Sequence, residues 1–139
     1  MNGIELMIDE HKYIKRMLQV LRKASFNLLK GEKPAYDDFY RMIDFVKTYA
    51  DDHHHGKEEK LLFNLMEEEL GDIGKVIIKN GMLVEHDMGR FHMAELRKAL
   101  EESKKGNEEA KLDIIANAVG YANLLDRHID KEDNVVYRF

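Results

Sequence analysis

Four stretches of this sequence carry apolar residues at alternating steps of three and four, the spacing of a helix that buries one stripe. The most regular stretch contains Ile114, Ala118, Tyr121, Leu125, His128, Glu132 and Val135. The other three stretches begin near Ile4, Phe39 and Met82. No stretch alternates apolar and polar residues as a half-buried strand does. The pattern therefore predicts an all-α fold in which four helices share one core.

Glycine and proline residues mark the expected turns between these helices. Gly31 closes the first helix, and Pro34 suits the start of the second. The second helix is expected to stop near Gly71, and Gly81 precedes the third. Gly106 separates the third helix from the fourth. Short connections between long amphipathic helices predict an antiparallel up-down-up-down four-helix bundle.

The composition is typical of one soluble helical domain covering residues 1–139. A chain of 139 residues can bury about two-thirds of its unfolded surface. The net charge of −5, with no basic stripe to offset it, argues against nucleic acid as a partner. No apolar run approaches the ~20 residues that span a bilayer, and no signal peptide is evident at the N-terminus. We therefore expect a cytoplasmic protein with no membrane partner, and the oligomeric state stays open.

The histidines are the candidate metal ligands, because the absence of cysteine leaves only nitrogen and oxygen donors. Four of the seven fall on the apolar stripes, one per helix, namely His11, His54, His86 and His128. A single buried histidine is ordinarily a core residue satisfied by one hydrogen bond. Four unsatisfied imidazoles would cost roughly 1 to 3 kcal/mol each, which in sum approaches the stability of a small domain. A metal ion removes this cost by binding the nitrogen lone pairs.

The same four histidines are expected at one depth in the bundle. His11 and His54 lie about 20 residues on either side of the first turn, and His86 and His128 lie about as far from the third turn. At ~1.5 Å per residue, each is about 30 Å from the turn that joins its pair of helices. All four should therefore meet near one end of the bundle.

A repeated motif adds carboxylates to the histidines. The ten residues that begin at His54 are echoed, 74 positions later, by those that begin at His128. Both segments contain histidine followed four residues later by glutamate, and such residues lie about 40° apart around an α-helix. The pairs His54 with Glu58 and His128 with Glu132 can therefore each contact one metal site.

The remaining candidates are expected outside the cluster. His55 and His92 are rotated by about 100° or more from their stripes and should be solvated. Glu59 and Asp133 should also point outward. His53 lies at the flank of its stripe, where it is either a spare ligand or a group that supports a ligand.

These motifs resemble the haemerythrin-like family, specifically its histidine-histidine-glutamate cation-binding group, over nearly the whole chain. They read, in order, Asp9-Glu10-His11, His54-x-x-x-Glu58, Glu85-His86-Asp87 and His128-x-x-x-Glu132. The resemblance implies a non-haem di-iron centre in a four-helix bundle, with two iron ions that also share an oxo, hydroxo or water bridge. It implies six metal ligands, namely His11, His54, Glu58, His86, His128 and Glu132. The first two histidines would bind one iron and the last two the other, with both glutamates bridging.

The sequence departs from the respiratory oxygen carriers of that family. Those proteins have two histidines four residues apart on the third helix, whereas Met82 and Arg90 flank His86 here. Their last carboxylate is an aspartate five residues after its histidine, whereas the stripe here favours Glu132 at four. Fewer fixed ligands leave more positions on iron open to water, dioxygen, peroxide or nitric oxide. This difference weakens the case for reversible oxygen carriage.

Three functions are compatible with the sequence. The first is a di-iron protein that binds O2, NO or peroxide for sensing, storage or detoxification. The second is an enzyme with the same site, either a di-iron peroxidase or oxidase or a protein that repairs iron centres under NO stress. The third is a helical interaction module without a functional metal. Metal analysis separates the third from the others, and ligand titration with turnover assays separates the first from the second.

Overall fold

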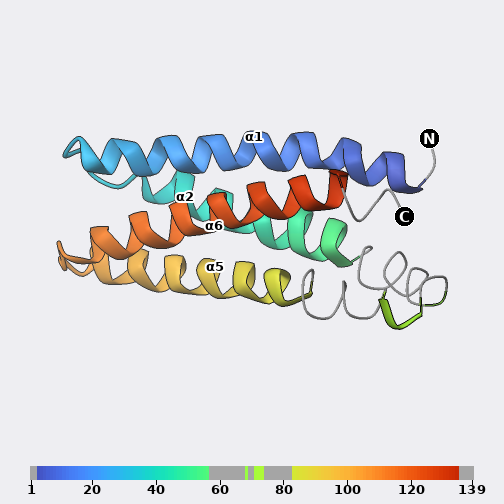
Figure 1. The fold of residues 1–139 in the computed structure, drawn as a ribbon. Helices are drawn as coiled ribbons and strands as arrows, with labels where there is room; N and C mark the ends of the chain where they lie inside the picture. Colours follow the sequence, from blue (N-terminus) through green and yellow to red (C-terminus); the bar gives the residue numbers. More distant parts are fainter. Residues whose placement is uncertain (1–2, 57–67, 69–70, 74–82, 135–139) are drawn as a thin grey trace.

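The computed structural model describes residues 3–56, 68, 71–73 and 83–134, and within these ranges it contains helices and turns but no strand. The predicted all-α class is therefore confirmed. The principal elements, in chain order, are α1 (Gly3–Leu29), α2 (Tyr36–Phe45), η1 (Val46–His55), α5 (Leu83–Lys104) and α6 (Ala110–Asn134). Since η1 continues directly from α2, these elements form four rods that lie along one another (Figure 1).

The rods run back and forth along one axis. In Figure 1, α1 runs from the N-terminal end to a turn, and α2 with η1 returns beside it. A second turn, at the same end of the bundle, joins α5 to α6. None of the helices in the described ranges has the length and apolar character needed to cross a membrane.

Both turns use the glycines predicted from the sequence. Gly31 has a φ of 89° and Gly106 a φ of 98°, values in the left-handed region that glycine adopts without strain. After α1, the N–H of Gly31 donates to the carbonyl of Leu28 at 3.1 Å, and the N–H of Glu32 donates to that of Asn27 at 3.2 Å. This pair of hydrogen bonds is a Schellman motif, which satisfies the last carbonyls of the helix.

Among the described residues, the core follows the predicted stripes except near the start of α1. Fully buried apolar side chains from the four rods include Ile14, Leu21, Phe39, Leu96, Leu100, Ile114 and Ile129. Ile8 lies three residues before His11, on the spacing of the first stripe, yet it is 36% exposed, whereas Met7 is buried. The buried face of α1 is thus rotated by one residue at its N-terminal end.

The second rod differs from the regular α-helix that was expected. It begins at Tyr36, two residues after Pro34, and changes at Val46 from an α-helix to a π-helix. A π-helix closes its hydrogen bonds between residues five apart; it is rare, and it often occurs at functional sites. Each of its turns holds more residues than an α-helical turn, so side-chain directions calculated at 100° per residue do not apply along η1.

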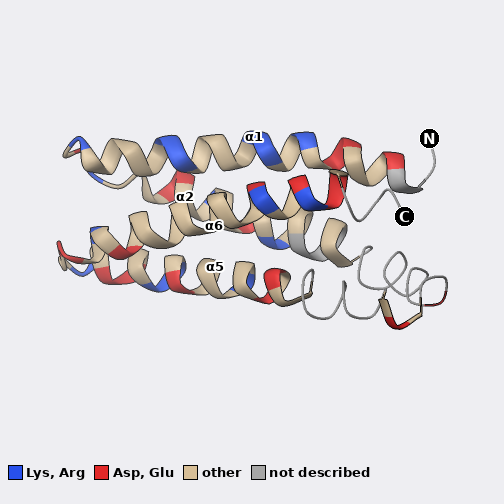
Figure 2. Cartoon of the chain, in the orientation of Figure 1, with Lys and Arg blue, Asp and Glu red and all other residues tan. Residues whose placement is uncertain are grey.

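Charged residues hold α1 against α6. Acidic and basic residues alternate along the C-terminal part of α6 (Figure 2). Lys15 of α1 reaches this segment, and its Nζ lies 2.8 Å from Asp130 and 3.6 Å from Asp126. The hydrogen bond with Asp130 raises the pKa of Lys15, which keeps the ammonium charged. This contact fixes the position of α1 relative to α6 one helical turn from His11.

Candidate metal site

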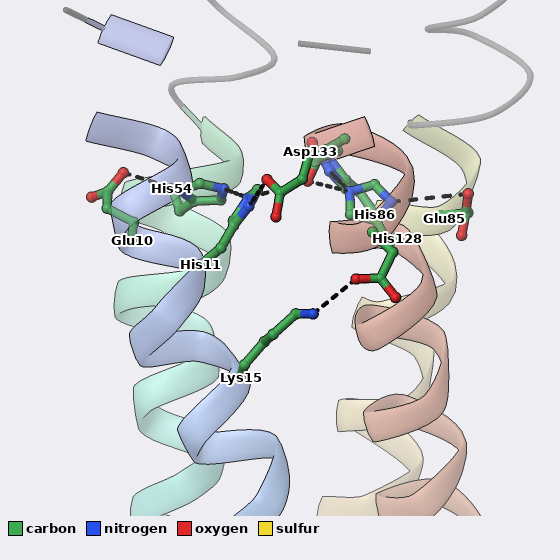
Figure 3. Close-up of polar contacts among 10 residues, drawn as sticks. Glu10, His11, Lys15, His54, Glu85, His86, His128 and Asp133 are labelled. Carbon is green, nitrogen blue, oxygen red and sulfur yellow. Dashed lines mark hydrogen bonds and ion pairs between the residues drawn. The ribbon is translucent and has the colours of Figure 1, made fainter. Parts of the chain in front are cut away.

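The four histidines predicted from the stripes meet at one level of the bundle, each from a different rod (Figure 3). All four side chains are buried. The Nε2 atoms of His11 and His54 lie 2.8 Å apart, and those of His86 and His128 lie 2.9 Å apart. The predicted convergence is therefore confirmed, and it produces two pairs of imidazoles.

The first group of possible ligands consists of His11, His54 and Glu132, whose donor atoms lie within 4.8 Å of one another. We call it the first cluster. Its outer side is lined by carboxylates, because His11 Nδ1 lies 2.8 Å from Asp133 Oδ1 and His54 Nδ1 lies 3.1 Å from Glu10 Oε1. Each Nδ1–H donates to its carboxylate, which directs the Nε2 lone pair inward.

The tautomers of His11 and His54 indicate whether the first cluster fits a cation. A neutral imidazole has one N–H donor and one lone pair. When both Nδ1 atoms of His11 and His54 donate outward, both Nε2 atoms carry lone pairs and face each other at 2.8 Å. Two acceptors at this distance repel each other unless a cation, either a proton or a metal ion, is shared between them. The donor atoms and their tautomers therefore fit a metal ion.

Two carboxylates beside the first cluster, those of Asp133 and Glu10, were not assigned a role from the sequence. Asp133 was expected to point outward, and this prediction is wrong, since its side chain is only 30% exposed and contacts His11. The stripe analysis considered each helix alone, whereas Asp133 reaches sideways to the adjacent α1. Glu10 belongs to a motif read from the sequence, but its contact with His54 needed the packing of α1 against η1 to be known.

The second group of possible ligands consists of His55, His86 and His128, also within 4.8 Å of one another. We call it the second cluster. The rings of His55 and His86 are stacked, with centroids 4.0 Å apart and an interplanar angle of 15°. Burial, together with the neighbouring His55 and His128, lowers the pKa of His86 far below its ordinary value. His86 is therefore neutral at pH 7 and keeps a lone pair.

The burial of His55 corrects the sequence analysis. His55 was expected to be solvated, yet its side chain is only 4% exposed. The expectation assumed 100° per residue, and the π-helical geometry of η1 invalidates this assumption. Consecutive residues His54 and His55 both lie in the interior, the former in the first cluster and the latter in the second.

Glu85 supports the second cluster from α5. Its Oε1 lies 3.9 Å from His128 Nδ1 and 2.7 Å from Lys131 Nζ. Interaction with His128, and then with Lys131, lowers the pKa of Glu85 to about 2 although burial opposes this shift. The carboxylate is therefore ionised at neutral pH and faces the outer nitrogen of His128.

Glu132 lies between the two clusters and is completely buried. Its Oε1 is 3.4 Å from His11 Nε2 and 3.3 Å from His128 Nε2. One carboxylate oxygen therefore lies within reach of a donor atom from each cluster. A cation placed at this point would contact both clusters.

A cavity of about 440 Å³ adjoins the second cluster. His55 and His86 form part of its wall, and Arg90 and Arg97 are among its charged lining residues. Arg90 is paired with Asp87 at 2.9 Å, and Arg97 lies 3.8 Å from Asp44. None of the residues of the first cluster lines this cavity, so the second cluster has the space for an added ligand.

Several predicted residues remain to be placed. Glu58, Glu59 and Met82 lie outside the described residues, and the side chain of His53 is not described. His92 is half-buried, and its Nδ1 lies 3.1 Å from Asn117 Oδ1. As expected, it takes no part in either cluster.

A family model described as Hemerythrin HHE cation binding domain matches residues 2–139. The chain belongs to this family, which confirms the resemblance seen in its motifs. Neither curated proteins nor solved structures gave a significant match. A cation-binding family and two buried clusters of histidine and glutamate together define a helical protein with a site that fits metal ions.

Proposed function

We propose that this protein holds two iron ions in the two clusters and binds a small ligand, namely O2, NO or peroxide, for sensing, storage or detoxification. The observation that carries this proposal is the position of Glu132. One buried oxygen lies 3.4 Å from a nitrogen of the first cluster and 3.3 Å from a nitrogen of the second. A carboxylate that bridges two metals lies within reach of the donor atoms of both, and Glu132 has such a position.

Each iron would be held by two of the histidines predicted from the sequence. His11 and His54 would bind the first ion, and His86 and His128 the second. Glu132 would bridge them. Glu58 is proposed as the second bridge on the sequence motif alone, because it lies outside the described residues.

The donor set is compatible with iron. Imidazole and carboxylate suit Fe(II), and the chain has no cysteine thiolate among its possible ligands. The buried carboxylates also offset the positive charge of two ferrous ions. When bound, ferrous ions supply open coordination positions and electrons to a small ligand. The chain contributes by orienting the imidazoles through Glu10 and Asp133 and by excluding water from the first cluster.

The ligand would reach the site through the cavity beside the second cluster. Met93 and Tyr121 line it together with His86, and basic residues such as Arg90 and Arg97 lie elsewhere on its wall. The apolar part of the wall restricts water near the metal, which slows loss of a bound small molecule.

The experiment is metal analysis followed by ligand titration. Protein produced in iron-replete medium is expected to contain about two irons per chain, as in other di-iron bundles. The reduced protein should then change its absorption spectrum on addition of O2, NO or peroxide. Glu102→Gln, a change at a partly buried residue of α5 at the opposite end of the rod, serves as the control. Absence of bound iron would contradict the proposal and favour a helical interaction module.

The cavity size favours a second candidate, an enzyme with the same site. A volume of about 440 Å³ exceeds the space of a diatomic molecule several times, since a water molecule occupies about 30 Å³ in the liquid. A peroxidase, an oxidase or a protein that repairs iron centres under NO stress would use this extra space for a reductant or a larger substrate. Turnover of peroxide with an added reductant would distinguish it from a binding protein.

A further inference from the structure

The π-helix η1 places two consecutive histidines in the interior. In an α-helix, adjacent side chains point about 100° apart, so only one of them normally lies on a buried stripe. Here His54 is 0% exposed and His55 is 4% exposed. Their rings, with centroids 5.5 Å apart, face different clusters. This geometry adds a fifth imidazole to the site.

The surroundings of His55 consist largely of other imidazoles. Its ring centroid lies 4.0 Å from that of His86 and 5.6 Å from that of His128. The three residues each offer a nitrogen within 4.8 Å of the other two. A metal that binds imidazole at about 2.0 to 2.1 Å can join donors up to about 4 Å apart. A rotation of the His55 ring, with smaller movements of the other two rings, would therefore bring the three nitrogens onto one ion.

We propose that His55 is a direct metal ligand, so that three imidazoles from η1, α5 and α6 hold the second ion. This inference rests on the proposed function, because it requires a metal in the second cluster. It goes beyond the six ligands predicted from the sequence and makes the two metal positions unequal, with two imidazoles in one and three in the other.

The alternative is an ordinary role as a core histidine, which requires only one hydrogen-bond partner. The position of His55 among other candidate ligands favours a ligand, because its ring stacks on that of His86 with nearly parallel planes. The lone pair of an imidazole lies in the plane of the ring, so His55 would rotate out of this stack in order to share an ion with His86. Its place on the cavity wall puts the same ion within reach of an added ligand.

The test compares His55→Ala with His92→Ala in protein loaded anaerobically with ⁵⁷Fe(II). His92 is the control because it is a half-buried histidine bonded to Asn117 and outside both clusters. We expect His55→Ala to weaken binding of one iron by more than about tenfold, since even supporting groups around metals give 10- to 100-fold effects. One of the two Mössbauer doublets should change and the other should stay. Added imidazole should restore the altered doublet.

A measurement on the unaltered protein tests the same inference even if a variant fails to fold. Each ligating imidazole keeps one N–H, which gives a strongly shifted, solvent-exchangeable proton signal beside ferrous iron. Five such signals are expected with His55 as a ligand, and four without it. His55→Gln, close in volume to histidine, provides a second variant for the same count.

The outcomes separate this inference from the proposed function. If the unaltered protein binds two irons but shows four exchangeable signals, and His55→Ala leaves both doublets unchanged, His55 is not a ligand and the di-iron proposal stands. If the unaltered protein binds no iron, both proposals fail. If one doublet changes, imidazole restores it and five signals are present, both are supported.

Discussion

The two clusters share η1 and α6 but differ in their third rod, which is α1 for the first and α5 for the second, and they also differ in charge and in access. The first cluster joins two imidazoles to Glu132 and is backed by Glu10 and Asp133 at hydrogen-bond distance. The second joins three imidazoles and has one supporting carboxylate, Glu85, at the longer distance of 3.9 Å. Only the second borders the cavity. We therefore expect the two clusters to have different roles within one site.

This difference has a physical consequence for bound metal. Carboxylates that accept a hydrogen bond from a ligating imidazole raise its basicity and strengthen its bond to the metal. The first cluster should therefore hold its ion more tightly, and the second should exchange its outer ligands more readily. We expect the added small ligand to bind at the second position.

The largest effect is expected from Glu132→Gln, which removes the one side chain that the clusters share. Glutamine keeps the volume but loses the charge, so both ions lose an anionic ligand. Iron content should fall by well over half, measured by metal analysis after desalting. Removal of a ligand costs more than the 10- to 100-fold loss seen for supporting groups. Normal iron content would show that the clusters do not depend on this carboxylate.

Two single-histidine variants should each remove the iron from a different cluster. His11→Ala removes a ligand from the first cluster, and His128→Ala removes one from the second. Each protein should retain about one iron, since an intact cluster still offers several donors. Mössbauer spectra should show the loss of a different doublet in each variant. Loss of the same doublet in both would contradict the division into two positions.

Smaller effects are expected from the supporting carboxylates. Glu10→Ala and Asp133→Ala should weaken the first position by about 10- to 100-fold, the range known for such groups. Glu85→Ala should weaken the second position less, because its oxygen lies 3.9 Å from His128. Competition with a chelator measures all three affinities. An equal loss from Glu85→Ala would mean that metal binding draws this carboxylate inward.

The smallest effect is expected in the scaffold. Gly31→Ala places a side chain at a φ of 89°, although no atom lies within 4 Å of the added Cβ. The cost is therefore that of the backbone alone, about 1 to 2 kcal/mol of unfolding free energy. Thermal denaturation measures it, and iron content should not change. A loss of iron from this variant would show that the site is coupled to the distant turn.

Much of this architecture could be predicted from periodicity. The steps of three and four located His11, His54, His86 and His128, and counting from the turns gave their common depth. Gly31 and Gly106 were predicted as helix ends because glycine is favoured at left-handed positions. These features depend on local geometry, which the sequence determines directly.

The missed features depend on packing between rods or on a change of helix type. Asp133 contacts His11 across the gap between α6 and α1, and no analysis of a single helix reveals this. His55 turns inward because η1 is a π-helix, and its sequence carries no evident signal for that geometry. Three consecutive histidines in this segment were the one available hint that more than one of them could lie inside.

The central claim is that Glu132 lies between two metal ions. Anomalous diffraction at the iron absorption edge, from crystals of the iron-loaded protein, tests it most directly. The account predicts two iron peaks, one near His11 and His54 and the other near His86 and His128, with the Glu132 carboxylate between them. A single peak, or two peaks without this carboxylate between them, would contradict it.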